Sequence, residues 1–309
     1  MKYSFVLPAY KAAYFRKAID SILNQTYTEF ELIIVNDASP DDIDSIIRSY
    51  QDSRIKYYVN EHNIGGKDLV AQWNRSISYA KGEYLILASD DDVYFPEYLE
   101  KMDALVMKYP NVKVFRPRVQ VVDGQDAILR VYGSLSEKVT PLEYWYHWNT
   151  VGSSIGHIVF ERESLIEKGG FVNFPMAWGS DDATMLMLGS DGICFANEIL
   201  YSFRNSGVNI TSQINDYYAL TKKIEAHRMF YNWMKDYLER YHASSDYDAF
   251  YKNVLLGELD ELFQNLTLGF INYSSLYAVL RSLPNIFRLE YVSRLSVIKR
   301  IIWKFCRNK

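Results

Sequence analysis

The sequence predicts an α/β fold in which a mostly parallel β-sheet is flanked by helices and followed by a helical C-terminal region. Over about the first hundred residues, apolar runs of strand length alternate with segments whose apolar residues recur at helical spacing. Strands that alternate with helices form parallel sheets covered on both faces. From about residue 215 onward the pattern is helical and rich in tyrosine, with no Gly/Pro-rich linker.

Most of the sheet is expected in the first half of the chain. Strands are expected over residues 3–10, 30–37, 55–59 and 83–89, and shorter ones near 113–122, 155–160, 193–196 and 199–203. Helices are expected over residues 14–24, 67–80 and 180–189, and from an N-cap at Ser39 through Ile43, Ile46 and Ile47. Three strands end in residues that could contact a ligand: PAY at 8–10, ND at 36–37 and SDDD at 89–92. Because ligands bind beyond the carboxyl ends of such strands, a nucleotide site is predicted there.

Composition narrows the class of protein. With 49% hydrophobic residues, a chain of 309 residues can build a sizeable core. Its two cysteines stand in no metal-ligand spacing, and neither a signal peptide nor an apolar run of membrane-spanning length is visible. The expectation is therefore an intracellular protein. A net charge of -4 with a basic C-terminal segment disfavours nucleic acid as a partner.

Three adjacent acids, Asp90, Asp91 and Asp92, end the strand expected over residues 83–89. A helix N-terminus could accommodate one of them, but adjacent like charges gain little from one helix end and repel one another. A divalent cation removes the difficulty, because Mg²⁺ or Mn²⁺ binds one or two carboxylates and completes its shell with substrate phosphates. The sequence therefore predicts a diphosphate ligand together with Mn²⁺ or Mg²⁺.

Two common phosphate-binding motifs are absent. The GGK of residues 65–67 is followed by Asp68, so there is no GxxxxGK[ST], and no GxGxxG follows the first strand. Instead, VLPAY in the first strand, IIVNDAS in the second, NIGG at 63–66 and KGEYLILASDDDVYFPEYL from residue 81 resemble, in order and spacing, the family 2 glycosyltransferases of GT-A fold. GGF at 169–171 and WGSDDA at 178–183 resemble the second half of that pattern, so the resemblance covers about residues 1–210.

The resemblance implies a nucleotide-sugar site with a metal ion. Pro8, Ala9 and Tyr10 would line the nucleobase and ribose, with Tyr10 offering a stacking face. Asp37 would accept a hydrogen bond from the base, which favours uracil because its N3–H is a donor.

Within the D-x-D-type element, the resemblance assigns the metal to Asp91 and the approach to the ribose to Asp90, with Asp92 as a supporting carboxylate of the metal site. Ser89 stands where a first Asp is common, which leaves the division of labour among the three acids open.

The second acidic pair is Asp181 and Asp182. The resemblance implies that Asp182 is the general base and that Asp181 orients the acceptor or its neighbour. The alternative is an N-cap for a helix that begins at residue 183, a role that Ser180 could fill equally well.

Five further positions carry weaker signals. Lys67 could face the pyrophosphate or only solvate a helix start, and Trp178 could stack on the sugar or belong to the core. Arg204 and Asn209 could contact the diphosphate or the acceptor, or lie in a surface loop. The sequence favours a structural role for His157 over a metal-binding one.

These features predict a metal-dependent inverting glycosyltransferase that moves a single sugar from a nucleotide sugar, with UDP favoured, to a saccharide or lipid-linked acceptor. Bacterial surface polysaccharide synthesis is the pathway that the resemblance implies. The catalytic domain is expected over residues 1–212, with a nucleotide-binding half of about 1–110 and an acceptor half of about 111–212, followed by a helical region over 213–309. The alternatives are a sugar nucleotidyltransferase, which would need a Gly-rich basic loop where AYKAAYF stands, and a nucleotide-sugar-binding module without turnover.

The tail over residues 285–309 is predicted to form a basic amphipathic helix. Its expected apolar face comprises Phe287, Tyr291, Leu295, Ile298, Ile302 and Phe305. Its expected basic face comprises Arg288, Lys299, Arg300, Lys304 and Arg307, with Arg294 as the exception. Such a helix could hold a cytoplasmic protein on the inner face of the membrane, or could pack on the catalytic domain or a dimer partner.

Overall fold

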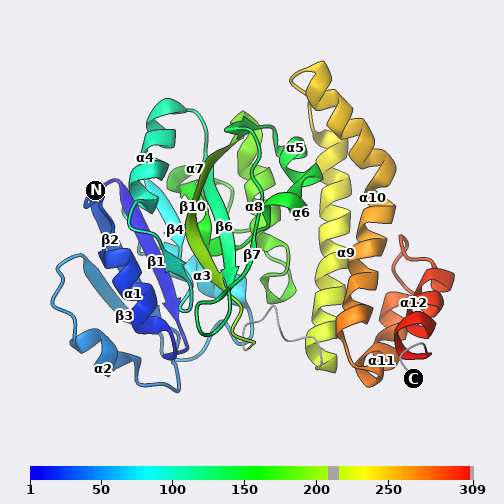
Figure 1. Cartoon of the computed structure of the whole chain (residues 1–309), viewed down its shortest axis with the longest axis horizontal. Helices are drawn as coiled ribbons and strands as arrows, with labels where there is room; N and C mark the ends of the chain where they lie inside the picture. Colours follow the sequence, from blue (N-terminus) through cyan, green and yellow to red (C-terminus); the bar gives the residue numbers. More distant parts are fainter. Residues whose placement is uncertain (208–215, 307–309) are drawn as a thin grey trace. The chain divides into compact units, whose positions relative to one another are not determined.

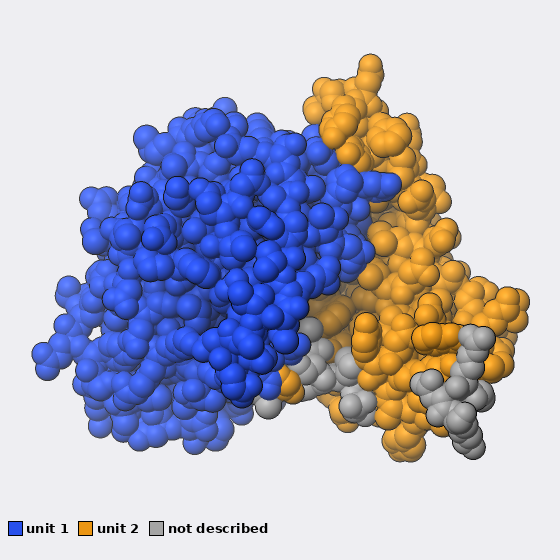
Figure 2. Space-filling view, viewed as in Figure 1, with its two compact units in different colours: residues 1–173, 180–206 blue, residues 174–179, 207–309 orange. Residues whose placement is uncertain are grey.

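The computed structural model describes residues 1–207 and 216–306. The chain divides into two compact units, which Figure 1 traces and Figure 2 colours separately. The first, here called the sheet unit, comprises Met1–Asn173 and Ser180–Ser206. The second, the helical unit, comprises Phe174–Gly179 and Gly207–Lys309.

The sheet unit contains a ten-stranded mixed sheet in the described residues. Its strands are β1 (Tyr3–Ala9), β2 (Phe30–Asn36), β3 (Ile55–Val59), β4 (Tyr84–Leu87), β5 (Val93–Tyr94), β6 (Val114–Val122), β7 (Ile128–Val131), β8 (Lys138–Val139), β9 (Val159–Glu161) and β10 (Ile193–Arg204). They follow the order β3-β2-β1-β4-β9-β6-β10-β5, with β7 paired to β6 and β8 to β10. The first four strands are mutually parallel, whereas β9 runs antiparallel to both of its neighbours.

Helices flank this sheet (Figure 1). They are α1 (Phe15–Leu23), α2 (Ile43–Arg48), α3 (Leu69–Ile77), α4 (Tyr98–Lys108), α5 (Pro141–Tyr146), α6 (Trp148–Val151), α7 (Arg162–Glu167) and α8 (Ser180–Leu188), with single 3₁₀ turns η1 (Ile155–His157) and η3 (Gly189–Asp191). The α/β fold with a helix-flanked sheet, predicted from the alternating pattern, is confirmed.

Hydrophobic burial explains why β1 and β2 lie at the centre of this unit. All seven residues of β2 are buried, as are six of the seven in β1. Such continuous burial is what strands covered on both faces require. Because β1 lies between β2 and β4, the order of the strands reverses there, and the carboxyl ends of β1 and β4 meet at the switch point.

Three local expectations differ from the structure. The helix after β2 is capped by Asp42, whose side chain accepts from the Ser45 amide at 3.0 Å, whereas Ser39 donates its hydroxyl to the carbonyl oxygen of Tyr10. The strands expected at 193–196 and 199–203 form the single strand β10, which shifts its register against β6 around Ile199. The strand expected over 155–160 is a 3₁₀ turn followed by β9.

The helical unit contains α9 (Tyr217–Arg240), α10 (Asp246–Tyr273), α11 (Leu276–Ile286) and α12 (Arg294–Cys306), and the short 3₁₀ turn η2 (Pro175–Ala177). The N-caps Asp216, Ser245 and Ser275 each accept a hydrogen bond from an amide three residues later, which explains where α9, α10 and α11 begin. No helix within the described ranges is long and apolar enough to cross a bilayer.

The single amphipathic helix predicted over the tail is not found in the described residues: α11 ends at Ile286, residues 287–293 lie in neither helix, and α12 begins at Arg294. Tyr291, expected on one apolar face with Leu295 and Ile298, lies in the turn before α12 and packs against Tyr231 and Phe263 at 4.4 and 5.8 Å between ring centroids. Packing within the unit therefore removes Tyr291 from the predicted apolar face. Of that face, α12 contains Leu295, Ile298, Ile302 and Phe305.

Candidate active site

The loop after β1 is fastened to the loop after β4 by Asp90. Its Oδ2 accepts hydrogen bonds from the backbone amides of Tyr10 and Lys11, at 3.0 and 2.8 Å. Burial raises the pKa of Asp90, and these two amides oppose the rise. The structure thus brings Pro8, Ala9 and Tyr10 together with the acidic loop, and Tyr10 keeps 42% of its surface exposed, as a stacking residue must.

Asp92 occupies the interior rather than the surface. It is fully buried, and its oxygens accept from the Tyr201 hydroxyl and, at 2.7 Å, from the backbone amide of Arg204. Burial raises the pKa of Asp92 to about 6, although both bonds lower it. Through these contacts Asp92 ties the acidic loop to β10.

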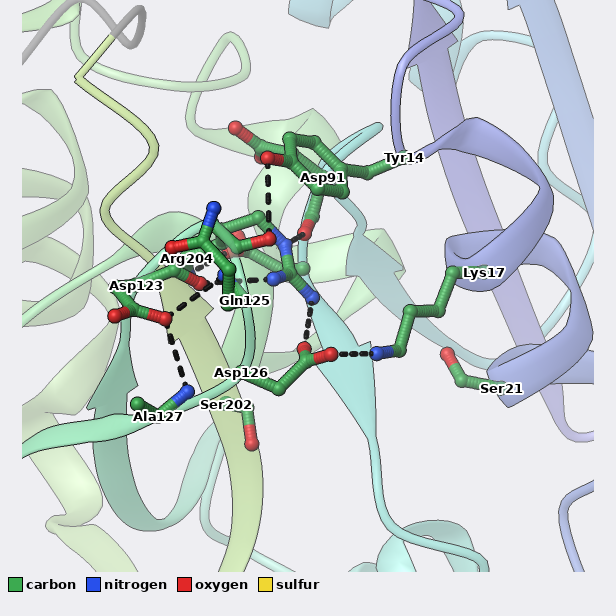
Figure 3. A network of polar contacts seen from close by, with 12 residues as sticks. Tyr14, Lys17, Ser21, Asp91, Asp123, Gln125, Asp126, Ala127, Ser202 and Arg204 are labelled. Atoms are coloured by element: carbon green, nitrogen blue, oxygen red, sulfur yellow. Dashed lines mark hydrogen bonds and ion pairs between the residues drawn. The ribbon is translucent and has the colours of Figure 1, made fainter.

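Arg204 does not lie in a surface loop, which was one of the two roles considered for it, but is the last residue of β10. Its side chain is 1% exposed and donates to the carbonyl oxygens of Asp91 and Asp123, at 2.8 and 2.9 Å, and to Asp126 Oδ1 at 2.7 Å (Figure 3). The guanidinium also lies 4.3 Å from the centre of the Tyr14 ring. Because these protein acceptors hold the guanidinium in the interior, Arg204 shapes the backbone at Asp91 rather than forming a surface loop. Asn209 lies outside the described residues.

Asp91 remains as the carboxylate best suited to a cation. Burial, followed by the charges of Asp92 and Asp90, raises the pKa of Asp91 to about 8. The described residues contain no group of three or more His, Cys, Asp or Glu side chains arranged around a metal position. One carboxylate completed by substrate phosphates is nevertheless a common Mg²⁺ arrangement, and a cation would relieve the repulsion that raises the pKa. The residues therefore fit a divalent cation shared with a diphosphate.

Asp37 organises the loop that carries NIGG. Its Oδ1 accepts from Asn60 Nδ2 at 2.7 Å, its Oδ2 from the Gly65 amide at 2.7 Å, and both oxygens from the Ile64 amide at 3.0 and 3.1 Å. A side chain at Gly65 would come within 3.1 Å of Asp37 Oδ2, which explains why glycine stands there. The carboxylate of Asp37, which was predicted to accept a hydrogen bond from the nucleobase, therefore also fixes the backbone of Ile64 and Gly65.

Lys67 and Trp178 lie in different units. Lys67 is exposed just before Asp68, which caps α3. Trp178 belongs to the helical unit, where its indole nitrogen donates to His227 Nε2 at 3.1 Å and its ring lies 4.3 Å from Lys223 Nζ. Trp178 therefore makes the contacts of a residue packed within the helical unit, which is the core role considered for it.

The second acidic pair occupies the first turn of α8. The helix begins at Ser180, so Ser180 lies within it rather than ahead of it as an N-cap. Asp182 is 8% exposed, and its Oδ1 accepts from the Tyr144 hydroxyl at 2.7 Å; Asp181 Oδ2 accepts from Ser153 at 3.2 Å. Burial, followed by the charge of Asp181, raises the pKa of Asp182 to about 7. A carboxyl group that titrates near neutrality can accept a proton efficiently.

Sequence reasoning missed the residues that hold this pair. Tyr144 comes from α5, Ser153 from the loop after α6, and a fully buried Arg116 from β6. Tyr144 is one of 26 tyrosines, and no local motif distinguishes it from the others. Arg116 is not distinguished by the strand pattern either, because β6 carries a second arginine, Arg118, two residues further on.

The raised pKa of Asp182 predicts a pH-dependent effect of Asp182→Asn on stability. An unfolded carboxyl titrates near 3.9, so between about pH 4 and 7 the folded protein binds a proton that the unfolded chain releases. The free-energy cost of burying the ionised carboxylate in the folded protein therefore grows from about pH 4 to about pH 7, and it is fully present above pH 7. Asp182→Asn should raise the melting temperature at pH 8, by about 2–4 °C per kcal/mol relieved, and leave it unchanged near pH 4.

Thermal unfolding of both proteins from pH 4 to 8 tests this, with Asp191→Asn, at an exposed position in η3, as the control. If Asp182 only caps the helix, its replacement should lower the melting temperature at neutral pH, contrary to the prediction.

Comparisons with known proteins place this site in a family. A model of glycosyl transferase family 2 matches residues 4–167. An uncharacterized glycosyltransferase of Rickettsia typhi is 40% identical over 112 residues, which cover 36% of this chain and 34% of that protein. The UDP-Glc:alpha-D-GlcNAc-diphosphoundecaprenol beta-1,3-glucosyltransferase WfgD of Escherichia coli is 31% identical over 126 residues, or 40% of this chain and 48% of that one. The chain thus spans less than half the length of either relative.

Two solved structures share the fold over nearly the whole chain. S. aureus TarS 1–349 in complex with UDP-GlcNAc superposes with a TM-score of 0.59 at 20% identity, covering 97% of this chain and 89% of that one. The mannosyltransferase PcManGT from Pyrobaculum calidifontis, in complex with GDP-Man and Mn²⁺, gives 0.57 at 14% identity, covering 99% and 86%. The family match covers the acidic loop of β4 and more than half of the 309 residues. The chain therefore belongs to glycosyl transferase family 2.

Proposed function

We propose that this glycosyltransferase moves a single sugar from a UDP-sugar to a hydroxyl group of its acceptor, with inversion, using Mn²⁺ or Mg²⁺ at Asp91 and Asp182 as general base. The observation that carries the proposal is the buried Asp182, held by Tyr144 in the same unit that presents the acidic loop of β4. The sheet unit thus holds both a carboxylate for a diphosphate-bound cation and a carboxyl group that titrates near neutrality.

The donor end of the site is formed by the loops after β1 and β2. Tyr10 offers an exposed ring to the base, while Pro8 and Ala9 support the loop. Asp37 is assigned to the base N3–H, which favours uracil, and Lys67 to the diphosphate. Support for UDP comes from TarS, whose structure contains UDP-GlcNAc, and from WfgD, a UDP-Glc-dependent glucosyltransferase, although PcManGT holds GDP-Man.

The reaction follows from these assignments. The acceptor hydroxyl gives its proton to Asp182 while its oxygen attacks the anomeric carbon, and the bond from that carbon to the diphosphate breaks with inversion. A bound divalent cation supplies charge stabilisation for the departing diphosphate. Asp90 keeps the loop of Tyr10 against that of Asp91, so base, ribose and diphosphate are oriented together. The acceptor is assigned to the saccharides and lipid-linked saccharides of bacterial surface polysaccharide synthesis, a class that includes the diphosphoundecaprenol substrate in the name of WfgD.

Asp182→Asn separates binding from chemistry. The amide keeps the shape of the carboxyl group and can still accept from Tyr144, but it cannot take up the acceptor proton. Donor affinity should stay near that of the wild type while kcat falls by about 10²–10⁴-fold. The measurement is nucleotide release from UDP-, GDP- and dTDP-sugars with and without Mn²⁺, together with calorimetric UDP affinity.

Asp181→Asn is the matched control and should cost less. Normal turnover by Asp182→Asn would remove the base assignment, and absence of turnover with every donor in the wild-type protein would favour the binding module.

A membrane surface is the second proposed partner, carried by the apolar residues of α12. Leu295, Ile302 and Trp303 are 60%, 55% and 55% exposed, and Ile298 is 47% exposed. Arg294 and Lys299 are exposed on the same helix. Exposed apolar side chains interleaved with basic ones suit an anionic lipid interface, at about 1 kcal/mol per basic residue near the surface. The proposal is peripheral attachment to the cytoplasmic leaflet, beside a lipid-linked acceptor.

Replacing Ile298 and Ile302 together by serine should weaken binding to vesicles of phosphatidylglycerol and phosphatidylcholine by about tenfold or more, since two exposed aliphatic side chains are lost. Cosedimentation measures this, and Ile128→Ser, at a 61% exposed position on β7, is the control. Equal binding by all three proteins would contradict attachment through α12.

A further inference from the structure

Arg116 is a buried cation close to the proposed base. It is fully buried on β6, and its Nη2 donates to the carbonyl oxygens of Val151 and Gly152 at 2.9 and 2.6 Å. The Arg116 Nε has no hydrogen-bond partner among the described residues. Two backbone carbonyls do not balance a buried positive charge, which is costly unless an anion lies nearby.

The anions that balance this charge are Asp181 and Asp182. Burial lowers the pKa of Arg116, while Tyr144, Asp182 and Asp181 raise it. In return, the charge of Arg116 lowers the pKa of both carboxyl groups against the effect of burial. Burial holds the pKa of the neighbouring His157 well below its usual range, so that ring adds no positive charge of its own.

Tyr144 joins Arg116 to Asp182 through two hydrogen bonds whose donors and acceptors are fixed. Arg116 Nη1 lies 3.4 Å from the Tyr144 hydroxyl oxygen, and that hydroxyl lies 2.7 Å from Asp182 Oδ1. A guanidinium has donors and no acceptor, so the tyrosine accepts from Arg116 and its single proton points to Asp182. Tyr144 thus holds one oxygen of Asp182 by a hydrogen bond that favours the ionised form of the carboxyl group.

We propose that Arg116 and Tyr144 are positioning residues for Asp182: Tyr144 fixes its Oδ1, and Arg116 supplies the charge that keeps the Asp181–Asp182 pair ionised when the acceptor arrives. The inference rests on the proposed role of Asp182 as the base. It predicts that loss of either residue shifts the titration of Asp182 to higher pH, because the ionised form loses a hydrogen bond or a neighbouring positive charge.

The test is a carbon-13 NMR titration of protein labelled at the aspartate carboxyl carbons, with the Asp182 signal identified by its loss in Asp182→Asn. Arg116→Met should raise the apparent pKa of Asp182 by about one unit or more, and Tyr144→Phe should raise it in the same direction. Arg116→Lys, which keeps the charge, should stay closer to the wild type. Arg118→Met is the matched control, because Arg118 stands two residues along β6 and donates to the Tyr132 carbonyl oxygen instead.

An Asp182 titration unchanged in both Arg116→Met and Tyr144→Phe would overturn the inference, and Tyr144→Phe alone decides if Arg116→Met does not fold. The pH profile of UDP release then separates the two claims. If Asp182 is the base, the acidic limb should move with the NMR titration, so that activity lost at pH 7 returns at pH 9. An NMR shift without a matching shift of the rate profile would show that Arg116 and Tyr144 do hold Asp182 in its ionised form, but that Asp182 is not the base and the proposed function fails at this residue.

Discussion

Two backbone amides, those of Tyr10 and Lys11, hold the Asp90 carboxylate, and the rest of the site depends on this contact. It joins the loops that follow β1 and β4, which are neighbours at the point where the order of the strands reverses. Without it, the exposed ring of Tyr10 and the carboxylate of Asp91 would belong to two independent loops. With it, one rigid edge of the sheet presents a stacking surface and an anion together.

The structure manages three adjacent acids by giving them different surroundings. Asp90 and Asp92 are held by protein donors, the first from the loop after β1 and the second from β10. Arg204 adds a buried positive charge and fixes the backbone of Asp91 by donating a hydrogen bond to its carbonyl oxygen. Burial, together with the charges of Asp92 and Asp90, raises the pKa of Asp91 to about 8. The pair at α8 follows the same logic, with Arg116 and Tyr144 in place of Arg204 and Tyr201.

Local patterns predicted the elements of the fold and the placement of the acids. The ends of β1, β2 and β4 carry their motifs because a strand and the polar residues after it are encoded within a dozen positions. The partners of those acids could not be predicted in this way. Asp92 meets Tyr201, 109 positions away, and Asp182 meets Tyr144, 38 positions away, through folding of the whole unit. The burial of Arg204 could not be predicted for the same reason, since two of its acceptors come from the turn between β6 and β7.

UDP affinity with and without Mn²⁺, measured by calorimetry for Asp91→Asn beside Asp90→Asn and Asp92→Asn, tests the division of labour among these acids most directly. The account predicts that Asp91→Asn melts at or above the wild-type temperature, because it loses a raised-pKa carboxyl, yet gains nothing from Mn²⁺ when it binds UDP. In Asp90→Asn and Asp92→Asn, Mn²⁺ should still strengthen UDP binding, because the account gives the cation to Asp91 and these two carboxylates to protein donors. UDP binding by Asp91→Asn that Mn²⁺ strengthens as much as in the wild type would contradict the account.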